Sequence, residues 1–340
     1  MAPPILRIED LTVTFRTRKG EAEAVRGLSY DLHAGETLAI VGESGSGKSV
    51  AALAVMGLLP GTATVSGQAL FEGADLLAMK KDERRRIRGG RMAMIFQDPM
   101  TAFNPVHTIG EQLAEAIRIH RPKVSKKDAF DEVEHLLRQV GVPEPGRRVH
   151  QYPHEFSGGM RQRAMIAMAI ANDPMVLIAD EPTTALDVTI QAQVMEVLAE
   201  AQEATGSAMI LITHDLGLVA GTADRVIVMY GGHAFEECVT RDAFYDSRNP
   251  YTRGLLRSIP RLSDERGVKL SPIPGAPPSI VAMPKGCAFA PRCVHRTEVC
   301  EERSADWEQV DIGHWTRCHH HEELPALDVR TGVGMTGGGS

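Results

Sequence analysis

The chain carries two hydrophobic patterns, and each predicts β-strands. Residues Ile5 to Phe15 and Ala24 to Leu32 alternate between apolar and polar positions, as expected of antiparallel strands with one face in a core. Further on, apolar residues run without interruption, which is typical of strands buried on both faces of a parallel sheet. Because helical stretches separate these runs, we predict an α/β fold with a mainly parallel sheet and an antiparallel β subdomain ahead of it. The runs are Thr37 to Val41, Met175 to Ala179, Ala208 to Thr213 and Arg225 to Tyr230.

A helical pattern occupies the middle of the chain, from about residue 108 to residue 153. Ile109, Leu113 and Ile117 fall on one face of a helix, and Ser125 with Asp128 predicts the start of another. A structureless stretch of this length would be unusual in a compact domain. We therefore expect an inserted helical subdomain at about residues 100–170.

The clearest chemistry lies between the first buried strand and a helix predicted over Lys48 to Leu59. Residues 42–49 read Gly-Glu-Ser-Gly-Ser-Gly-Lys-Ser, the phosphate-binding loop pattern. Glycines let the backbone wrap closely around a phosphate, and the helix start adds a partial positive charge. Lys48 would reach the β- and γ-phosphates, and Ser49 would bind Mg²⁺. The residues expected to hold a nucleoside triphosphate are Gly42, Ser44, Gly45, Ser46, Gly47, Lys48 and Ser49.

Polar residues at the ends of other predicted strands form a second set. Asp180 is placed to hold Mg²⁺, and the adjacent Glu181 could orient or deprotonate the water that attacks the γ-phosphate. Gln97 follows a strand-like segment, at the edge where α/β sheets place ligands. His214 ends the neighbouring strand and could contact the γ-phosphate, although a lone histidine there is more often structural.

Composition limits the class of protein. With 340 residues, 43% hydrophobic and 24% charged, the chain is typical of a soluble globular protein with two domains. It has no apolar run near the roughly 18–20 residues that cross a bilayer, and its charged start does not fit a signal peptide. We expect a cytosolic protein that touches a membrane only through partners. The net charge of −7 argues against binding along a nucleic-acid backbone.

The stretch Phe156 to Arg163 resembles the signature of ABC transporter ATPases, usually Leu-Ser-Gly-Gly-Gln. Phe156 and Met160 depart from that form, but the phosphate contact falls to the Ser157 hydroxyl and the glycine N–H groups. The resemblance covers about residues 5–245 with the motifs in the family's order. It implies these roles: Phe15 as adenine platform, Gln97 as Q-loop, Asp180 and Glu181 as Walker B pair, Ala185-Leu186-Asp187 as D-loop, and His214 as switch histidine.

The resemblance also implies a dimer that closes around ATP. Ser157, Gly158 and Gly159 of one subunit would face the phosphate loop of the other, with hydrolysis releasing the pair. The helical subdomain would then carry the motion to a membrane subunit through Gln97. The expected catalytic residues are Glu181, His214 and Gln97; Asp187 is expected near the nucleotide, and the Mg²⁺ ligands are Ser49, Gln97 and Asp180.

Longer stretches resemble the ATP-binding subunits of oligopeptide and dipeptide importers: Phe96 to Pro105, Tyr152 to Arg163 and Ala179 to Val188. This resemblance implies a second, related ATPase, two membrane permeases and an extracellular peptide-binding protein, with the chain peripheral on the cytoplasmic face of the membrane. Nickel importers share much of this sequence, so another cargo is an open alternative. A soluble ABC ATPase acting on nucleic acid or ribosomes is a further alternative, which the acidic charge and the helical insert disfavour.

Four of the five cysteines gather after a stretch rich in Pro and Gly: Cys287, Cys293, Cys300 and Cys318. A cytosolic location disfavours disulfides, so a metal centre is the leading interpretation. Zinc sites usually contain a short Cys-x₂₋₄-Cys pair, which is absent here, and wider spacing suits an iron–sulfur cluster at least as well. Gly286 to Cys293 resembles the tail of peptide importers, which implies a structural [4Fe–4S] cluster on the four cysteines. Zinc and free thiols are the alternatives.

These patterns divide the chain into an ABC nucleotide-binding domain at 1–245, a small Cys-rich domain at 246–325 and a disordered tail at 326–340. Cys238 stands apart from the other cysteines and is expected to be a buried apolar residue. His319 to His321, beside the last cysteine, could offer imidazole ligands, but we expect them to be a solvated polar run.

Overall fold

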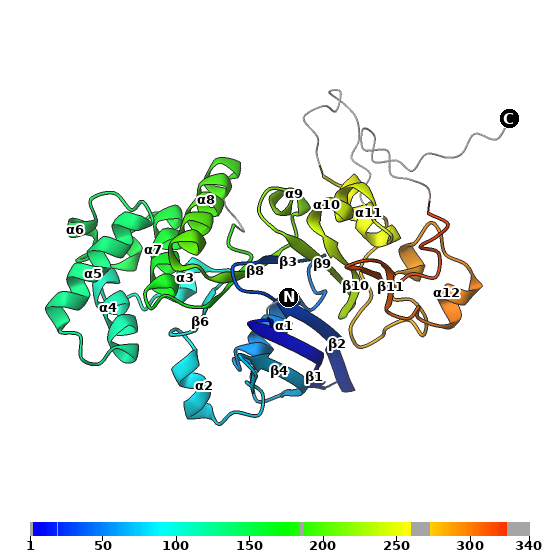
Figure 1. The fold of residues 1–340 in the computed structure, drawn as a ribbon, viewed down its shortest axis with the longest axis horizontal. Helices are drawn as coiled ribbons and strands as arrows, with labels where there is room; N and C mark the ends of the chain where they lie inside the picture. The colour runs from blue at the N-terminus through cyan, green and yellow to red at the C-terminus, as the bar shows by residue number, and fades with distance from the viewer. Residues whose placement is uncertain (1–2, 19, 184–186, 260–272, 325–340) are drawn as a thin grey trace. The chain divides into compact units, whose positions relative to one another are not determined.

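The computed structural model describes residues 3–18, 20–183, 187–259 and 273–324 (Figure 1). The chain divides into two compact units, each built from separate segments. The first unit takes its residues from 1–6, 31–36 and 71–212, and the second from 7–30, 37–70 and 213–340. The domain boundaries at residues 245 and 325 stay predictions, because these units are not consecutive stretches of the chain.

The first unit contains a parallel sheet in the order β8-β7-β6. Met92 pairs with Val176 and Val176 with Ala208, so the strands run in register and end at the same edge. Every residue of these strands is buried, as the continuous apolar runs predict. The elements of this unit are β5 (Ala74–Asp75), α2 (Lys81–Ile87), β6 (Met92–Ile95), α3 (Pro99–Ala102), α4 (Ile109–His120), α5 (Lys126–Gln139), α6 (Pro145–Arg148), α7 (Gly158–Ile170), β7 (Val176–Asp180), α8 (Val188–Thr205) and β8 (Ala208–Thr213).

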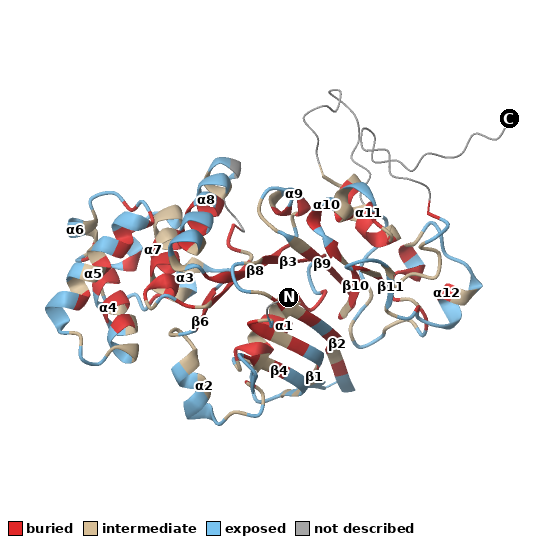
Figure 2. Cartoon of the chain, viewed as in Figure 1, coloured by how far each residue is buried: buried red, intermediate tan, exposed pale blue. Residues whose placement is uncertain are grey.

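The predicted helical region is present in this unit. The helix α4 buries Ile109, Leu113 and Ile117 on one face, and Ser125 caps α5 by accepting a hydrogen bond from the Asp128 N–H at 3.1 Å. The two helices pack against each other and against α7 (Figure 1). The highly charged helix α2 buries no residue and is mostly exposed in Figure 2, as expected of a solvated helix face.

The second unit holds the strand that precedes the phosphate loop. β3 runs parallel to β9, with Leu38 opposite Arg225, and β9, β10, β12 and β11 follow as antiparallel neighbours. A separate sheet has the order β2-β1-β4. The elements of this unit are β1 (Leu6–Thr17), β2 (Gly20–Leu32), β3 (Thr37–Val41), α1 (Lys48–Val55), β4 (Ala63–Phe71), α9 (Leu216–Val219), β9 (Arg225–Tyr230), β10 (His233–Val239), α10 (Thr240–Tyr245), α11 (Pro250–Arg257), α12 (Glu298–Glu302), β11 (Glu308–Asp311) and β12 (His314–Thr316).

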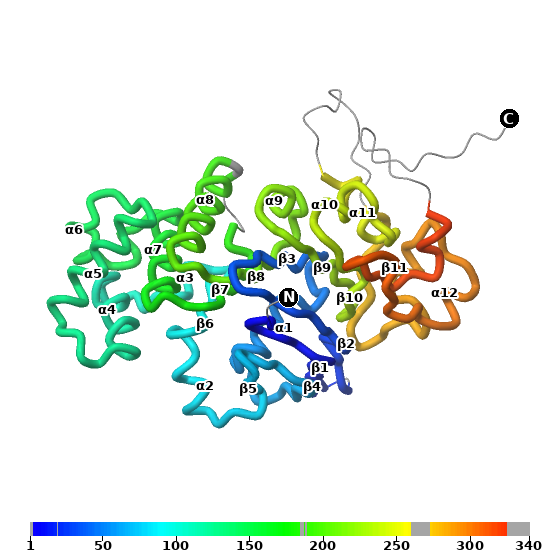
Figure 3. Tube along the Cα trace, viewed as in Figure 1, coloured from blue at the N-terminus to red at the C-terminus, as the bar shows by residue number. Residues whose placement is uncertain are grey.

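An aromatic cluster joins the late segments of the second unit. Tyr230, Phe235, Tyr251 and Phe289 surround one another with ring centroids 4.5–6.1 Å apart. They come from β9, β10, α11 and the segment that holds the four clustered cysteines, residues 287–318, which we call the cysteine segment. The last described part of the chain therefore packs on the same core as the sheet. Figure 3 shows this last segment, which contains α12 and β11, beside β10.

Two details differ from the sequence predictions. The helix after the phosphate loop ends at Val55 rather than Leu59, because Gly57 adopts a left-handed φ of 63° that stops the helix. The sheet is also less purely parallel than predicted, since β10, β11 and β12 extend it with antiparallel pairs. In the described ranges, no helix has the length and apolar character needed to span a bilayer.

Candidate nucleotide site and cysteine cavity

The phosphate loop leaves the buried strand β3 and enters α1. Gly42, Gly45 and Gly47 have φ values of 153°, 80° and 104°, which favour glycine. A Cβ on Gly42 would lie 2.2 Å from the Met229 carbonyl oxygen, and one on Gly47 would lie 2.4 Å from that of Ala24. The loop can follow this path only because these residues have no side chain.

Lys48 lies folded over the loop. Its side chain is 4% exposed, and Nζ donates hydrogen bonds to the carbonyl oxygens of Gly42 at 2.7 Å and Glu43 at 3.0 Å. Ser46 is buried within the loop, whereas Ser44 and Gly45 are exposed at its tip. A buried ammonium beside a helix N-terminus concentrates positive charge, so this part of the unit is suited to an anionic ligand.

Two more residues predicted to contact the nucleotide belong to the second unit. Phe15 is half-buried near the end of β1, with part of its ring accessible. His214 is exposed immediately after β8. Their roles toward adenine and the γ-phosphate stay predictions.

The first unit brings the predicted glutamine and glutamate together. β6 and β7 are parallel neighbours, and beyond their ends Gln97 Nε2 donates to Glu181 Oε2 at 3.0 Å. Asp180, the last residue of β7, is 5% exposed. Glu181 has a φ of 45°, and its N–H donates to the Ile212 carbonyl oxygen at 2.8 Å. A left-handed non-glycine backbone costs on the order of 1 kcal/mol and clusters at functional sites.

The signature segment forms the start of α7. Ser157 is the N-cap, and its hydroxyl accepts a hydrogen bond from the Met160 N–H at 3.3 Å. Ser157 and Gly158 are exposed, and Gly159 is half-buried. Phe156, which stands where leucine is usual, is 2% exposed and anchors the segment in the core. The substitution therefore preserves the apolar anchor and leaves the polar edge of the helix accessible.

Part of the predicted D-loop, Ala185 and Leu186, lies outside the described residues. Asp187 is exposed and caps α8, with its carboxylate accepting from the Ile190 N–H at 2.9 Å. A side chain in this position fixes where the helix begins.

The four clustered cysteines line one small cavity of the second unit. Together with Phe289 and His320, among others, they enclose about 20 Å³, roughly the room for one water molecule. The Cys287 N–H donates to the Cys300 carbonyl oxygen at 2.8 Å, which draws the two ends of the segment together. Burial raises the pKa of Cys293 to about 11 and that of Cys318 to about 12.

Lining the same cavity does not by itself make the four cysteines a metal site. Among the residues that the structure describes, no group of three or more His, Cys, Asp or Glu side chains is arranged to hold a metal ion. The thiols face the same space without converging on one point, so the iron–sulfur cluster stays a prediction. Cys238 is 0% exposed and lies apart from the cavity, as expected, and burial raises the pKa of its thiol well above the usual range.

The expectation for the histidine run is wrong. His319, His320 and His321 are half-buried, and each ring has a protein partner. His320 Nε2 lies 2.8 Å from the Thr297 hydroxyl, and both His319 and His320 line the cysteine cavity. The sequence pattern missed this because burial here depends on contacts with residues far along the chain.

Sequence reasoning also missed two residues that hold the phosphate loop. Arg292 forms a bidentate ion pair with the Glu43 carboxylate, and the Tyr251 hydroxyl accepts a hydrogen bond from the Glu43 N–H at 2.9 Å. Hydrogen bonding to Glu43 raises the pKa of Arg292 despite its burial, so the guanidinium is charged. The one sequence signal for this ion pair is the arginine directly before Cys293, in a segment where the cysteines suggest a metal site instead.

Comparison with known proteins agrees with these features. Residues 25–184 match the family described as ABC transporter, and residues 235–300 match that described as oligopeptide/dipeptide transporter, C-terminal region. The chain is 54% identical over 299 residues to the dipeptide transport ATP-binding protein DppD of Bacillus subtilis, covering 87% of this chain and 89% of that protein. This chain belongs to the ATP-binding proteins of ABC-type oligopeptide and dipeptide transporters.

Other members of this family of transport ATP-binding proteins match over similar stretches. The chain is 51% identical over 296 residues to OppD of Salmonella typhimurium, covering 87% of this chain and 88% of that protein. It is 50% identical over 315 residues to OppD of Mycobacterium tuberculosis, covering 93% of this chain but 52% of that protein. The chain therefore spans about half the length of the mycobacterial relative.

The fold is also that of solved ABC cassettes. A dimeric post-hydrolysis structure of the ATP-binding cassette MJ0796, bound to ADP and Pi, matches with a TM-score of 0.63 and 26% identity. The match covers 69% of this chain and 99% of that one. The predicted ABC-type α/β fold is confirmed.

Proposed function

We propose that this chain binds ATP with Mg²⁺ and hydrolyses it as the nucleotide-binding subunit of an oligopeptide or dipeptide importer. The observation that carries the proposal is the ammonium of Lys48, buried over the loop carbonyls at the start of α1. An ammonium held there is pre-positioned for phosphate oxygens. The name of the relative DppD, a dipeptide transport ATP-binding protein, supports the same assignment.

In the second unit, the loop N–H groups and Lys48 would hold the β- and γ-phosphates. The Ser49 hydroxyl at the start of α1 would contribute to Mg²⁺ binding. The partly accessible ring of Phe15 offers a surface on which adenine can stack. The exposed His214 would contact the γ-phosphate.

In the first unit, Asp180 would contribute to Mg²⁺ binding, and the metal would neutralise charge on the phosphates. Glu181 would orient or deprotonate the attacking water. The hydrogen bond from Gln97 fixes the orientation of that carboxylate, which supports a role for Glu181 in positioning water. Gln97 would in addition reach Mg²⁺ and transmit the state of the site to the helical region.

We propose further that two such subunits close around ATP. Ser157, Gly158 and Gly159 form an exposed to half-exposed edge at the N-terminus of α7, a long helix whose start favours an anion. This edge and Asp187 would meet nucleotide held by a partner subunit. The dimeric state of the cassette MJ0796 supports the assignment.

The wider assembly is inferred from the names of the relatives. We expect a second, related ATPase, two membrane permeases and an extracellular peptide-binding protein. The chain would sit on the cytoplasmic side of the membrane as a peripheral subunit. Peptides are the cargo that the relatives' names support.

The donor set of the cysteine cavity supports the proposal of an iron–sulfur cluster. Cys287, Cys293, Cys300 and Cys318 all line it, and thiolates are the ligands that such clusters require. A [4Fe–4S] cluster would act as a structural crosslink for a segment with few large apolar residues. Zn²⁺ is the alternative ion for the same four thiols.

ATPase activity of the co-expressed subunits tests the whole proposal. The assembly in lipid is expected to hydrolyse ATP several times faster when the binding protein carries peptide than when it is empty. K48A should abolish this activity, because it removes the phosphate-binding ammonium. Equal rates with loaded and empty binding protein would contradict the peptide assignment, and full activity in K48A would contradict the nucleotide site.

A further inference from the structure

The ion pair between Glu43 and Arg292 joins the phosphate loop to the cysteine segment within the second unit. Nη1 of Arg292 donates to Glu43 Oε2 at 2.5 Å, and Nη2 donates to Oε1 at 2.9 Å. The arginine side chain is 5% exposed and that of the glutamate 26%. The two residues are 249 positions apart, so only the folded chain brings them together.

The guanidinium is fixed at every donor position. Nε donates to the Pro274 carbonyl oxygen at 2.9 Å, Nη1 also to the Tyr230 hydroxyl at 3.1 Å, and Nη2 also to the Ile273 carbonyl oxygen at 3.3 Å. With the two bonds to Glu43, these use all the N–H groups that an arginine has. The side chain therefore cannot turn away without leaving buried donors unsatisfied.

The position of Glu43 creates an electrostatic problem for the loop. Its carboxylate follows Gly42 directly in a loop whose N–H groups and Lys48 ammonium are suited to phosphate. A second negative charge beside a triphosphate is repelled, the more so in partly buried surroundings. Arg292 supplies the compensating charge, and Tyr251 fixes the backbone of the same residue through its hydroxyl.

Stability alone does not account for such a pair. A buried ion pair can often be replaced by apolar side chains of similar size with little loss of folding free energy. The aromatic cluster around Tyr230 already holds the cysteine segment against β9 and α11 through apolar contact. The charge on Arg292 thus has a use at this position beyond holding the chain together.

We propose that Arg292 is a positioning residue for ATP: it neutralises and orients Glu43, so that the phosphate loop accepts the triphosphate. The inference rests on the proposed role of the loop in binding ATP. The segment between Cys287 and Cys293 then contributes, through Arg292, to the structure of the nucleotide site.

Nucleotide affinity of the purified full-length chain tests the proposal, measured with fluorescent mant-nucleotides. R292M leaves Glu43 unpaired and should weaken ATP binding at least tenfold. E43Q/R292M removes both charges and should bind within about threefold of the wild type. R292K keeps the charge but loses the bidentate geometry, so it should fall between R292M and the wild type. A double variant no better than R292M, or wild-type affinity in R292M, would overturn the proposal.

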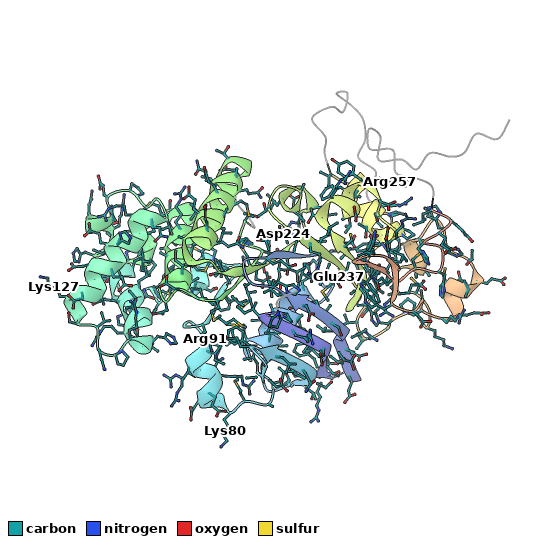
Figure 4. All side chains as sticks on the ribbon, viewed as in Figure 1. Lys80, Arg91, Lys127, Asp224, Glu237 and Arg257 are labelled. Carbon is teal, nitrogen blue, oxygen red and sulfur yellow. The ribbon has the colours of Figure 1, made fainter. Side chains whose placement is uncertain are left out.

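The dependence of the R292M effect on the charge of the nucleotide distinguishes a positioning role of Arg292 from a purely structural one. The loss in R292M should be largest for mant-ATP, smaller for mant-ADP and smallest for mant-AMP, and should shrink at high salt. An equal loss for all nucleotides would mean a distorted fold and would overturn the proposal. The matched control is R225M, which breaks the Arg225–Glu237 pair of the same unit and should bind ATP normally (Glu237 is labelled in Figure 4).

Two further variants keep the outcome decisive. If R292M does not fold, E43Q alone serves: it should bind ATP at least as tightly as the wild type, and a tenfold loss would overturn the proposal. K48A tests the loop itself. If K48A loses ATP while R292M does not, only the present inference fails; if K48A also binds normally, the proposed nucleotide site fails with it.

Discussion

Gln97 and Glu181 are 84 positions apart and share a hydrogen bond of 3.0 Å beyond the ends of two neighbouring parallel strands. The glutamine amide donates to one carboxylate oxygen, so the orientation of Glu181 depends on where the Gln97 segment lies. Gln97 is followed by Asp98, which caps α3. A movement of that segment would therefore directly change the orientation of the Glu181 carboxylate.

Replacing Glu181 by glutamine should stop turnover without weakening ATP binding. The amide keeps the size and one hydrogen-bonding oxygen but cannot accept a proton, so kcat should fall about 100-fold or more while the Kd for ATP stays within about threefold. Phosphate release and mant-ATP titration give the two quantities. E196Q, which changes an exposed glutamate on α8, is the control and should behave like the wild type. Normal hydrolysis in E181Q would exclude Glu181 as the water-positioning residue.

Two glycines of the phosphate loop should respond very differently to alanine. G47A places a Cβ 2.4 Å from the Ala24 carbonyl oxygen at a φ of 104°, whereas a Cβ at Gly45 meets nothing within 4 Å. G47A should therefore lower the free energy of unfolding by about 3 kcal/mol and abolish ATP binding, and G45A should lower it by about 1 kcal/mol. Denaturant unfolding of the two variants side by side measures this, and equal losses would contradict the close approach at Gly47.

His233 should make the folded protein less stable in mild acid. Burial, with smaller effects of Arg317 and Arg26, lowers its pKa from 6.5 to about 4. The unfolded chain takes up the proton near pH 6.5 and the folded chain only near pH 4. The stability that neutral His233 contributes is therefore complete above pH 6.5 and falls toward pH 4. The loss should be about 2 kcal/mol by pH 5.

The H233Q variant measures that contribution. Its melting temperature should change less between pH 7.5 and pH 5 than that of the wild type, because the titrating group is gone. H135Q removes an exposed histidine on α5 and should follow the wild type. An identical pH dependence in H233Q and the wild type would contradict the lowered pKa of His233.

The cysteine cavity should bind iron through its lining thiols. Protein purified without oxygen should be brown and contain about four irons per chain. C293S should lose most of the iron and the colour, whereas C238S, which changes a buried cysteine outside the cavity, should keep both. A colourless protein with one zinc per chain would replace the iron–sulfur assignment by a zinc site.

The sequence predicts the elements that depend on local pattern. The buried strands, the glycine loop and the cap at Ser125 follow from runs, spacing and turn chemistry over a few residues. The predicted end of α1 at Leu59 is wrong, because the left-handed Gly57 stops the helix; a glycine near a helix end is the usual sequence signal for such a stop.

The features that sequence reasoning missed depend on contacts between distant residues. Nothing near Glu43 indicates that its partner is Arg292, because the pairing needs the late segment to pack on β9. The half-buried state of His320 likewise depends on Thr297 and the cavity around the cysteines. Such contacts have no periodic signature, so they become visible only in the folded chain.

The aromatic cluster bears on any effort to shorten this protein to a minimal cassette. Cutting the chain after β10 would remove Tyr251, Phe289 and Arg292 together, uncovering the Tyr230 ring and leaving Glu43 as a lone acid in the loop. A trimmed version should accordingly be redesigned at Glu43 and Tyr230 at the same time, since deletion alone would leave both residues without the neighbours that suit them.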